Sequence, residues 1–320
     1  MNNSKNFALI GASGYIAPRH MKAIKDTGNN LIVSLDPYDG IGIMDSNFPE
    51  ADFFTEFEKF DTFIDNFNRK SQIDYFSISS PNYFHEAHIR YGLQHNGDVI
   101  CEKPLVLNPS DIDSLKIIEQ ETGKRVYNIL QLRLHPSIIA LKKRVTKELK
   151  ENPNKIYDID LTYLTSRGKW YFVSWKGDES KSGGIASNIG VHFYDMLCWI
   201  FGDVEENIVH LKTPDTNAGY FKLKNATVRW FLSVNYDYIP NEVKATGQRT
   251  FRSITVDNEE LEFSGGFTDL HTRSYQEILK GNGFGLDEAY GSIRTVSTIR
   301  NLIPIGLHGD YHPFCKKVLK

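Results

Sequence analysis

The chain has 320 residues, which is enough for about two domains of ordinary size. Hydrophobic residues make up 40% and charged residues 24% of it, values typical of a globular protein in water. The net charge of −3 gives no overall positive field, so we expect neither nucleic acid nor a membrane as a partner. A polar start and the lack of an apolar run of about 18–20 residues predict a cytoplasmic protein.

The first third of the chain alternates short β-rich runs with helical patterns. Strands are predicted at 7–10, 31–35, 52–54, 73–79, 98–101 and 125–129, and helices are predicted after most of them. Strands that alternate with helices form parallel sheets with right-handed crossovers. The pattern predicts a doubly wound parallel sheet over residues 1–130.

The pattern changes after residue 130. A helix at 137–150 precedes a strand at 156–164 whose side chains alternate, which indicates one solvated face. Further strands are predicted at 226–235, 243–246, 252–256 and 261–263, and apolar helices at 185–201 and 286–302. Residues 131–320 are therefore expected to form an α+β domain with a large, mostly antiparallel, open-faced sheet.

A glycine-rich turn follows the first predicted strand. Gly11, Gly14 and Ala17 have the spacing Gly-x-x-Gly-x-x-Ala, which departs from the usual Gly-x-Gly-x-x-Gly. Gly11 suits a tight turn, Gly14 lets backbone approach a pyrophosphate, and the helix that follows offers free N–H groups to phosphates. A purely structural turn is the alternative.

Asp36 favours cofactor binding over that alternative. It ends the second predicted strand, where an acid accepts hydrogen bonds from the adenosine ribose. Its charge would repel a 2′-phosphate and no Arg follows it, so NAD is expected rather than NADP. Taken alone, Asp36 could instead cap a turn before Pro37.

Two later strand ends carry polar residues. Ser79, Ser80, Pro81 and Asn82 follow the fourth strand, and Glu102-Lys103-Pro104 follows the fifth. Ligands bind beyond the carboxyl ends of such strands, so the Lys103 ammonium could polarise a substrate oxygen or exchange its proton. The alternative is an ordinary surface lysine.

A polar stripe crosses the apolar helix predicted at 185–201. Asn188, His192 and Asp195 are spaced by four and then three residues, which places them on one helical face. His192 could act as an acid or base with Asp195 selecting its tautomer, or it could be a core histidine held by Asp195.

In this order, these motifs resemble the Gfo/Idh/MocA oxidoreductases over nearly the whole chain. Ala-Pro-Arg-His at 17–20, residues 128–136 and residues 188–192 further resemble its WlbA/WbpB dehydrogenases. That resemblance implies oxidation by NAD of the C3 hydroxyl of a UDP-N-acetyl-glucosaminuronate, in the synthesis of diacetamido-uronic acid units of surface polysaccharide (O-antigen). It also implies a Rossmann domain at 1–130, a domain for substrate binding and oligomerisation at 131–320, and a homotetramer.

The resemblance assigns residue roles as well. Lys103 and His192 match the catalytic pair, and Asn188 stands where many relatives have Asp; an amide orients a hydroxyl but cannot relay its proton. The expected cofactor contacts are Gly11, Ser13, Gly14, Tyr15, Ile16, Asp36, Thr55, Ser80, Pro81, Asn82, His85, Glu102, Lys103, Gln131 and Trp175. The expected substrate contacts are Lys103, Arg133, Arg167, Tyr171, Lys176, Asn188 and His192.

No complete set of metal ligands is visible in the sequence, so no metal is expected. Two other functions remain open. One is another dehydrogenase of the family, acting on inositol or a simple sugar. The other is a regulator that senses NAD without turnover.

Overall fold

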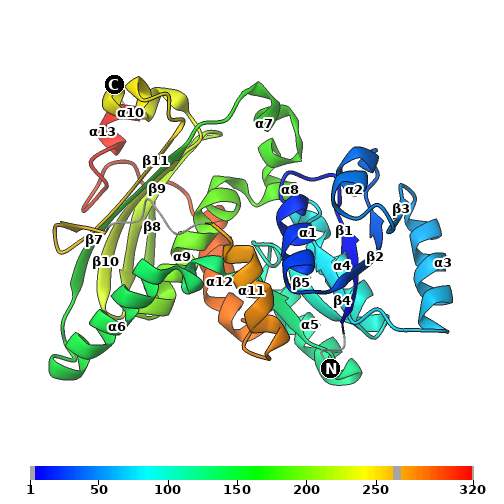
Figure 1. Ribbon diagram of the computed structural model, residues 1–320. Helices are drawn as coiled ribbons and strands as arrows, with labels where there is room; N and C mark the ends of the chain where they lie inside the picture. Colours follow the sequence, from blue (N-terminus) through cyan, green and yellow to red (C-terminus); the bar gives the residue numbers. More distant parts are fainter. Residues whose placement is uncertain (1–3, 262–267, 319–320) are drawn as a thin grey trace. The chain divides into compact units, whose positions relative to one another are not determined.

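The computed structural model describes residues 4–261 and 268–318. The chain divides into two compact units, which are described separately (Figure 1). The first unit comprises Met1–Gln131 and Asp269–Tyr290, and the second comprises Leu132–Thr268 and Gly291–Lys320.

A six-stranded parallel sheet forms the centre of the first unit, as predicted. Its strands are β1 (Asn6–Ile10), β2 (Asn30–Leu35), β3 (Asp52–Phe54), β4 (Tyr75–Ile78), β5 (Asp98–Cys101) and β6 (Val126–Asn128). They lie in the order β3-β2-β1-β4-β5-β6, so the strand order reverses between β1 and β4. A ligand crevice in this type of sheet opens at that reversal.

Helices connect these strands. They are α1 (Ala17–Asp26), α2 (Ile41–Asn47), α3 (Phe57–Asn68), the 3₁₀ turn η1 (Asn82–Phe84), α4 (His85–Gln94) and α5 (Pro109–Thr122). The sequence specifies the ends of α5 clearly: Asn108 and Asp111 form a capping box, and Gly123 ends the helix in the left-handed conformation at φ 69°.

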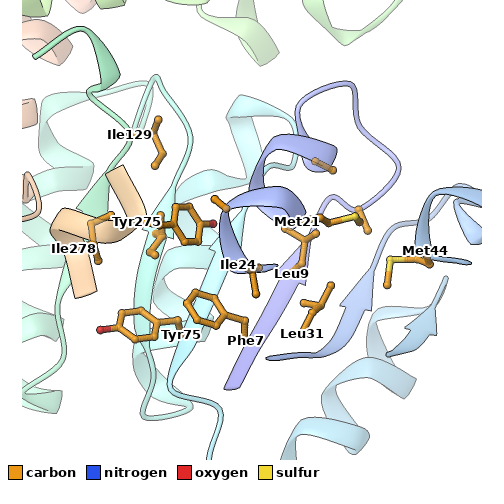
Figure 2. Close-up of a cluster of buried hydrophobic side chains, with 14 residues drawn as sticks. Phe7, Leu9, Met21, Ile24, Leu31, Met44, Tyr75, Ile129, Tyr275 and Ile278 are labelled. Carbon is orange, nitrogen blue, oxygen red and sulfur yellow. The ribbon is translucent and has the colours of Figure 1, made fainter. Parts of the chain in front are cut away.

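The first unit also contains a segment from the far end of the chain. Helix α11 (Leu270–Leu279) packs on α1, and its Tyr275 and Ile278 join the core formed by Phe7, Ile24 and other buried side chains (Figure 2). The sequence predicts that all of 131–320 belongs to the second domain, and for Asp269–Tyr290 the structure differs. Local pattern shows that α11 is amphipathic but not which core its apolar face joins.

The second unit is built on a mixed, mostly antiparallel sheet, as predicted. Among the strands that the structure describes, only β7 and β10 pair in parallel, and the order is β12-β11-β7-β10-β9-β8. The strands are β7 (Tyr157–Thr165), β8 (Val204–Lys212), β9 (Thr216–Leu223), β10 (Ala226–Ser233), β11 (Thr250–Val256) and β12 (Glu259–Glu260).

The second unit also contains longer helices. They are α6 (Pro136–Glu151), α9 (Val191–Phe201) and part of α12 (Leu286–Asn301). Helix α12 begins in the first unit and ends in the second. Shorter elements are η2 (Gln131–Leu134), α7 (Lys169–Val173), η3 (Trp175–Gly177), α8 (Glu179–Ser182), the π-helical turn η4 (Ala186–Gly190), η5 (Tyr236–Tyr238), α10 (Asn241–Ala245) and α13 (Cys315–Val318).

The two faces of this sheet differ. Helix α9 covers one face, where Phe201 packs on Tyr157 and Phe193 on Tyr163 (Figure 1). On the other face Asp158 is exposed, but Phe314 from the C-terminal segment packs on Phe231. The face predicted to be open is therefore partly covered by its own chain.

One predicted strand is wrong. Residues 243–246 belong to α10 and the turn after it, because Pro240 and Gly247 confine a segment too short to extend a sheet. Of the strand predicted at 261–263, all but Leu261 lies outside the described residues. Throughout the described ranges, no helix has both the length and the apolar composition needed to cross a bilayer.

Candidate active site

The glycine turn lies where β1 meets the end of β4. Gly11 has φ +95°, and a Cβ atom at this position would lie 2.5 Å from the Ser80 backbone nitrogen. At Gly14 a Cβ would come no closer than 3.3 Å, to the Gly11 carbonyl oxygen. Ala17 is fully buried at the start of α1. Gly11 is therefore required by the close approach of the β4 loop as well as by its own backbone conformation.

The backbone around this turn leaves two donors available. The N–H groups of Gly14 and Ala17 donate within the turn, and Pro18 has no N–H. Tyr15 and Ile16 have no acceptor for their N–H groups among the described residues. Free N–H groups beside a helix N-terminus bind phosphate, so the turn fits the pyrophosphate of a dinucleotide.

Asp36 links this turn to the end of β2. Its Oδ2 accepts the Ser13 N–H at 2.9 Å, and its Oδ1 accepts the Tyr38 N–H at 3.0 Å. The second bond is the turn cap that the sequence left open as an alternative. A carboxylate has about four lone-pair sites, so these two bonds leave capacity for a ribose hydroxyl.

Other predicted cofactor contacts, in the glycine turn and after β3, are more exposed than Asp36. The Ser13 hydroxyl donates to the Tyr38 carbonyl oxygen at 2.9 Å. The Thr55 hydroxyl donates to Glu56 at 3.2 Å, and Tyr15 is 85% exposed. Their side chains are accessible to a ligand at the carboxyl edge of the sheet.

The loop after β4 is joined to its neighbours by side chains. Ser79 donates from Oγ to the Gly11 carbonyl oxygen at 2.9 Å, and Ser80 Oγ lies 2.9 Å from His88 Nδ1. Pro81 leads into η1, where Asn82 is buried. These contacts hold the β4 loop against the glycine turn.

His85 has a different place from the one expected. Its Nδ1 lies 2.7 Å from the Pro104 carbonyl oxygen and its Nε2 lies 2.9 Å from the Ser80 carbonyl oxygen. The ring is only 1% exposed, and burial lowers its pKa. His85 thus joins the loops that follow β4 and β5, and its ring is not exposed to a cofactor.

Glu102 is also turned into the interior. Its Oε1 accepts from His20 Nε2 at 3.1 Å and from His271 Nε2 at 2.7 Å, and its Oε2 accepts the Lys103 backbone N–H at 3.2 Å. Burial alone would raise the pKa of Glu102, but the two histidine hydrogen bonds hold it well below its ordinary value. Lys103 is half-buried, and its peptide bond to Pro104 is cis.

Gln131, at the end of the first unit, has a buried Oε1 atom. In the described chain no donor reaches this oxygen. Buried acceptors are normally satisfied, so this oxygen fits a site in which a bound ligand donates to it.

In the second unit, Asn188 and His192 are both half-buried, on the π-helical turn η4 and the first turn of α9. Asn188 Nδ2 donates to the Tyr171 hydroxyl at 2.9 Å. The Tyr171 ring is only 6% exposed, while neighbouring Trp170 is 79% exposed. Residues 169–182 therefore form the short helices α7, η3 and α8 and present Tyr171 to Asn188.

Two cations in and just before these short helices stand out among the described residues. Arg167 and Lys176 form no salt bridge with any residue that the structure describes. Burial and then the charge of Arg167 lower the pKa of Lys176, whose Nζ lies 5.5 Å from the centre of the half-buried Trp175 ring. Uncompensated cations of this kind fit an anionic ligand.

Arg133 differs from these cations. Its Nε and Nη2 atoms donate to Asp195 at 2.9 and 2.7 Å, and both side chains are buried. Both oxygens of Asp195, the carboxylate expected to select the His192 tautomer, therefore accept hydrogen bonds from Arg133. This carboxylate also neutralises the Arg133 guanidinium, which was expected to contact the substrate.

The sequence does not indicate the roles of His20 and His271. His20 lies in the Ala-Pro-Arg-His segment at 17–20, and the family resemblance of that segment is the only indication in the sequence that His20 is important. His271 had none, because it approaches Glu102 from 169 residues away.

Comparison with known proteins identifies two family domains. Residues 5–129 match the Gfo/Idh/MocA model described as an oxidoreductase family with an NAD-binding Rossmann fold. Residues 154–246 match the C-terminal alpha/beta domain of the same oxidoreductase family.

Solved structures extend the match over the whole chain. The WlbA (WbpB) dehydrogenase of Thermus thermophilus, in complex with NAD and alpha-ketoglutarate, is 51% identical, with a TM-score of 0.93 over 97% of this chain and 99% of that one. The same enzyme was solved with NAD and UDP-GlcNAcA. The Bordetella pertussis WlbA dehydrogenase, 19% identical over 97% of this chain and all of that one with a TM-score of 0.75, shares the fold.

Curated relatives match more weakly. The 2,7-anhydro-N-acetylneuraminate hydratase of Mediterraneibacter gnavus is 25% identical over 63% of this chain, and the glucose-6-phosphate 3-dehydrogenase of Bacillus subtilis is 24% identical over 62%. The chain spans 50% and 54% of the lengths of these relatives.

Proposed function

This chain belongs to the Gfo/Idh/MocA family of NAD-binding oxidoreductases, and on that premise we propose that it oxidises the C3 hydroxyl of UDP-GlcNAcA to a ketone. The observation that carries the proposal is the 50% identity, over 97% of the chain, to a dehydrogenase solved with NAD and UDP-GlcNAcA. The glycine turn fits NAD, and so do the N–H groups of Tyr15 and Ile16 and the Oε1 atom of Gln131, for which the described residues provide no hydrogen-bond partner.

The reaction breaks one C–H and one O–H bond of the substrate and forms a C=O bond. Bound NAD supplies the hydride acceptor at the nicotinamide. The chain must take the hydroxyl proton, and we assign this to the Lys103 amine or the His192 imidazole. Asn188 orients the hydroxyl through its amide, held by the Tyr171 hydroxyl.

Substrate recognition is assigned to Arg167 and Lys176. A UDP-uronate carries a diphosphate and a carboxylate, and these two side chains are cations that form no salt bridge among the described residues. Arg133 is left out of this set because Asp195 already satisfies it.

The test is NADH absorbance with UDP-GlcNAcA as substrate, comparing the wild type with Lys103→Ala. We expect the variant to lose at least about 100-fold in kcat, the range general acid–base groups contribute, while still binding NAD. Lys70→Ala, at an exposed position of the same unit, should match the wild type.

Other results would redirect the proposal. Wild-type turnover by Lys103→Ala would refute the role of Lys103. NADH formation with inositol but not with UDP-GlcNAcA would select the sugar or inositol alternative. Tight NAD binding without turnover of any sugar nucleotide would favour a regulator.

The product and setting follow from the same proposal. A 3-keto uronate is a substrate for transamination, consistent with cytoplasmic synthesis of diacetamido-uronic acid units for O-antigen. We also propose a homotetramer formed through the second unit, which light scattering would contradict by returning a monomer mass.

A further inference from the structure

Five buried polar side chains form one continuous hydrogen-bonded network in the first unit. Ser77 of β4 lies 2.7 Å from the hydroxyl of Tyr275 on α11, and that hydroxyl lies 2.7 Å from His20 Nδ1 on α1. His20 and His271 then meet on Glu102 Oε1. All five are at most 6% exposed, and Figure 2 shows the Tyr275 hydroxyl directed toward α1.

The direction of each hydrogen bond can be derived. Glu102 is ionised, so both histidine Nε2 atoms donate to it. Burial lowers the pKa of His20, so its ring is neutral and its Nδ1 must accept from Tyr275. The Tyr275 oxygen can then accept from Ser77. Each of the five side chains takes part in at least one of these hydrogen bonds, and such networks fix their members in one arrangement.

His20, Glu102 and His271 also have the composition of a metal site, and their ligand atoms lie close together. The geometry favours hydrogen bonds between these atoms over a shared metal ion. The separations of 2.7 and 3.1 Å are hydrogen-bond lengths, and the His20 Nε2 that would ligate a metal must carry the proton.

The network ends on the peptide that carries Lys103. Glu102 Oε2 accepts the Lys103 N–H, and Asn128 Nδ2 donates to the carbonyl oxygens of Cys101 and Glu102 at 3.0 and 3.2 Å. The Glu102 carboxylate is thus fixed by histidines on one oxygen and holds the Lys103 peptide with the other.

We propose that His271 and His20 are positioning residues, which act through Glu102 to hold Lys103 in the orientation that proton transfer requires. This inference rests on the proposed dehydrogenase function. Neither histidine needs to touch the substrate. A displacement of about 1 Å at a reacting group can reduce the rate by about 100-fold, so fixing this peptide has a kinetic consequence.

The experiment compares two polar replacements of His271. The amide nitrogen of Gln reaches the position of His Nε2, whereas that of Asn is too short to reach Glu102. We expect His271→Asn to lower kcat by about 100-fold with NAD affinity within about threefold of wild type, and His271→Gln to recover most of the loss. Thr272→Val is the matched control, because Thr272 lies on α11 and contacts Asp26 rather than Glu102.

A double-mutant cycle shows whether the effect passes through Lys103. Adding His271→Asn to Lys103→Ala should reduce the residual rate no further. An undiminished effect in that background, equal rates for the Gln and Asn variants, wild-type kcat for His271→Asn, or one equivalent of bound metal in the purified protein would overturn this inference alone. Wild-type turnover by Lys103→Ala would overturn this inference together with the role of Lys103, whereas failure of the wild type to form NADH with UDP-GlcNAcA would overturn the proposed function.

Discussion

Gly11 is the residue at which backbone conformation and close packing coincide. Its φ is +95°, and an added Cβ would lie within 2.6 Å of backbone atoms of Ser79 and Ser80. Backbone atoms cannot turn aside as a flexible side chain can. We expect Gly11→Ala to lower the free energy of unfolding by more than about 3 kcal/mol and to weaken NAD binding by over about 100-fold.

Gly28 provides the control for this prediction. It also has a positive φ, +72°, but an added Cβ would meet nothing within 4 Å. Gly28→Ala should therefore cost only the conformational strain, about 1 kcal/mol, and leave NAD binding unchanged. Urea unfolding and calorimetric titration with NAD measure both quantities. Equal NAD affinity in the two variants would show that the contact with the β4 loop is unimportant.

The sequence predicts the site residues that are recognised by their spacing along the chain. Gly11, Gly14 and Asp36 could be found because their spacing along the chain reflects one βαβ unit. The partners of Glu102 and Arg133 could not, because hydrogen bonds across 169 and 62 residues leave no periodic trace.

The Arg133–Asp195 pair connects two elements, η2 and α9. Both side chains are buried, so removing one partner leaves an uncompensated charge. We expect Asp195→Leu to destabilise the protein by about 3–5 kcal/mol.

The control for that prediction removes both charges. Arg133→Met combined with Asp195→Leu should be clearly more stable than Asp195→Leu alone, because no charge is left unpaired. Urea unfolding midpoints provide the comparison. A loss below about 1 kcal/mol in the single variant would contradict burial of this pair.

Helices and strands were predicted correctly where one hydrophobic periodicity continues over many residues. The helix expected at 286–302 is α12 (Leu286–Asn301), and the strand expected at 156–164 is β7 (Tyr157–Thr165). Strand β8 was missed because Glu205, Glu206 and Asn207 obscure its alternation. The stretch at 243–246 was assigned wrongly because so few residues cannot distinguish a helical turn from a strand.

At the scale of the whole molecule, buried histidines predict sensitivity to acid. His312 is 3% exposed, and burial lowers its pKa to about 4. The unfolded chain takes up this proton below about pH 6.5, so stability falls as the pH drops from about 6.5 toward 4. Burial lowers the pKa of His20 and His85 as well, which adds to the effect.

The contribution of His312 can be isolated by substitution. Between pH 7.5 and 5 the wild type should lose about 2 kcal/mol that His312→Gln does not lose. His308→Gln, at an exposed position, should show the wild-type dependence. Urea unfolding at the two pH values tests this, and identical losses in all three proteins would exclude His312 as a contributor.

The return of Asp269–Tyr290 to the first unit has a consequence for synthesis on the ribosome. Tyr275 and Ile278 complete a core that begins at Phe7, so the nucleotide-binding unit stays incomplete until the intervening Leu132–Thr268 has been translated. At about 5–20 residues per second this delay lasts roughly 7–27 s. The N-terminal unit, made first, is therefore expected to be finished only after most of the second unit has emerged, and a chaperone that shields its exposed core would act during that interval.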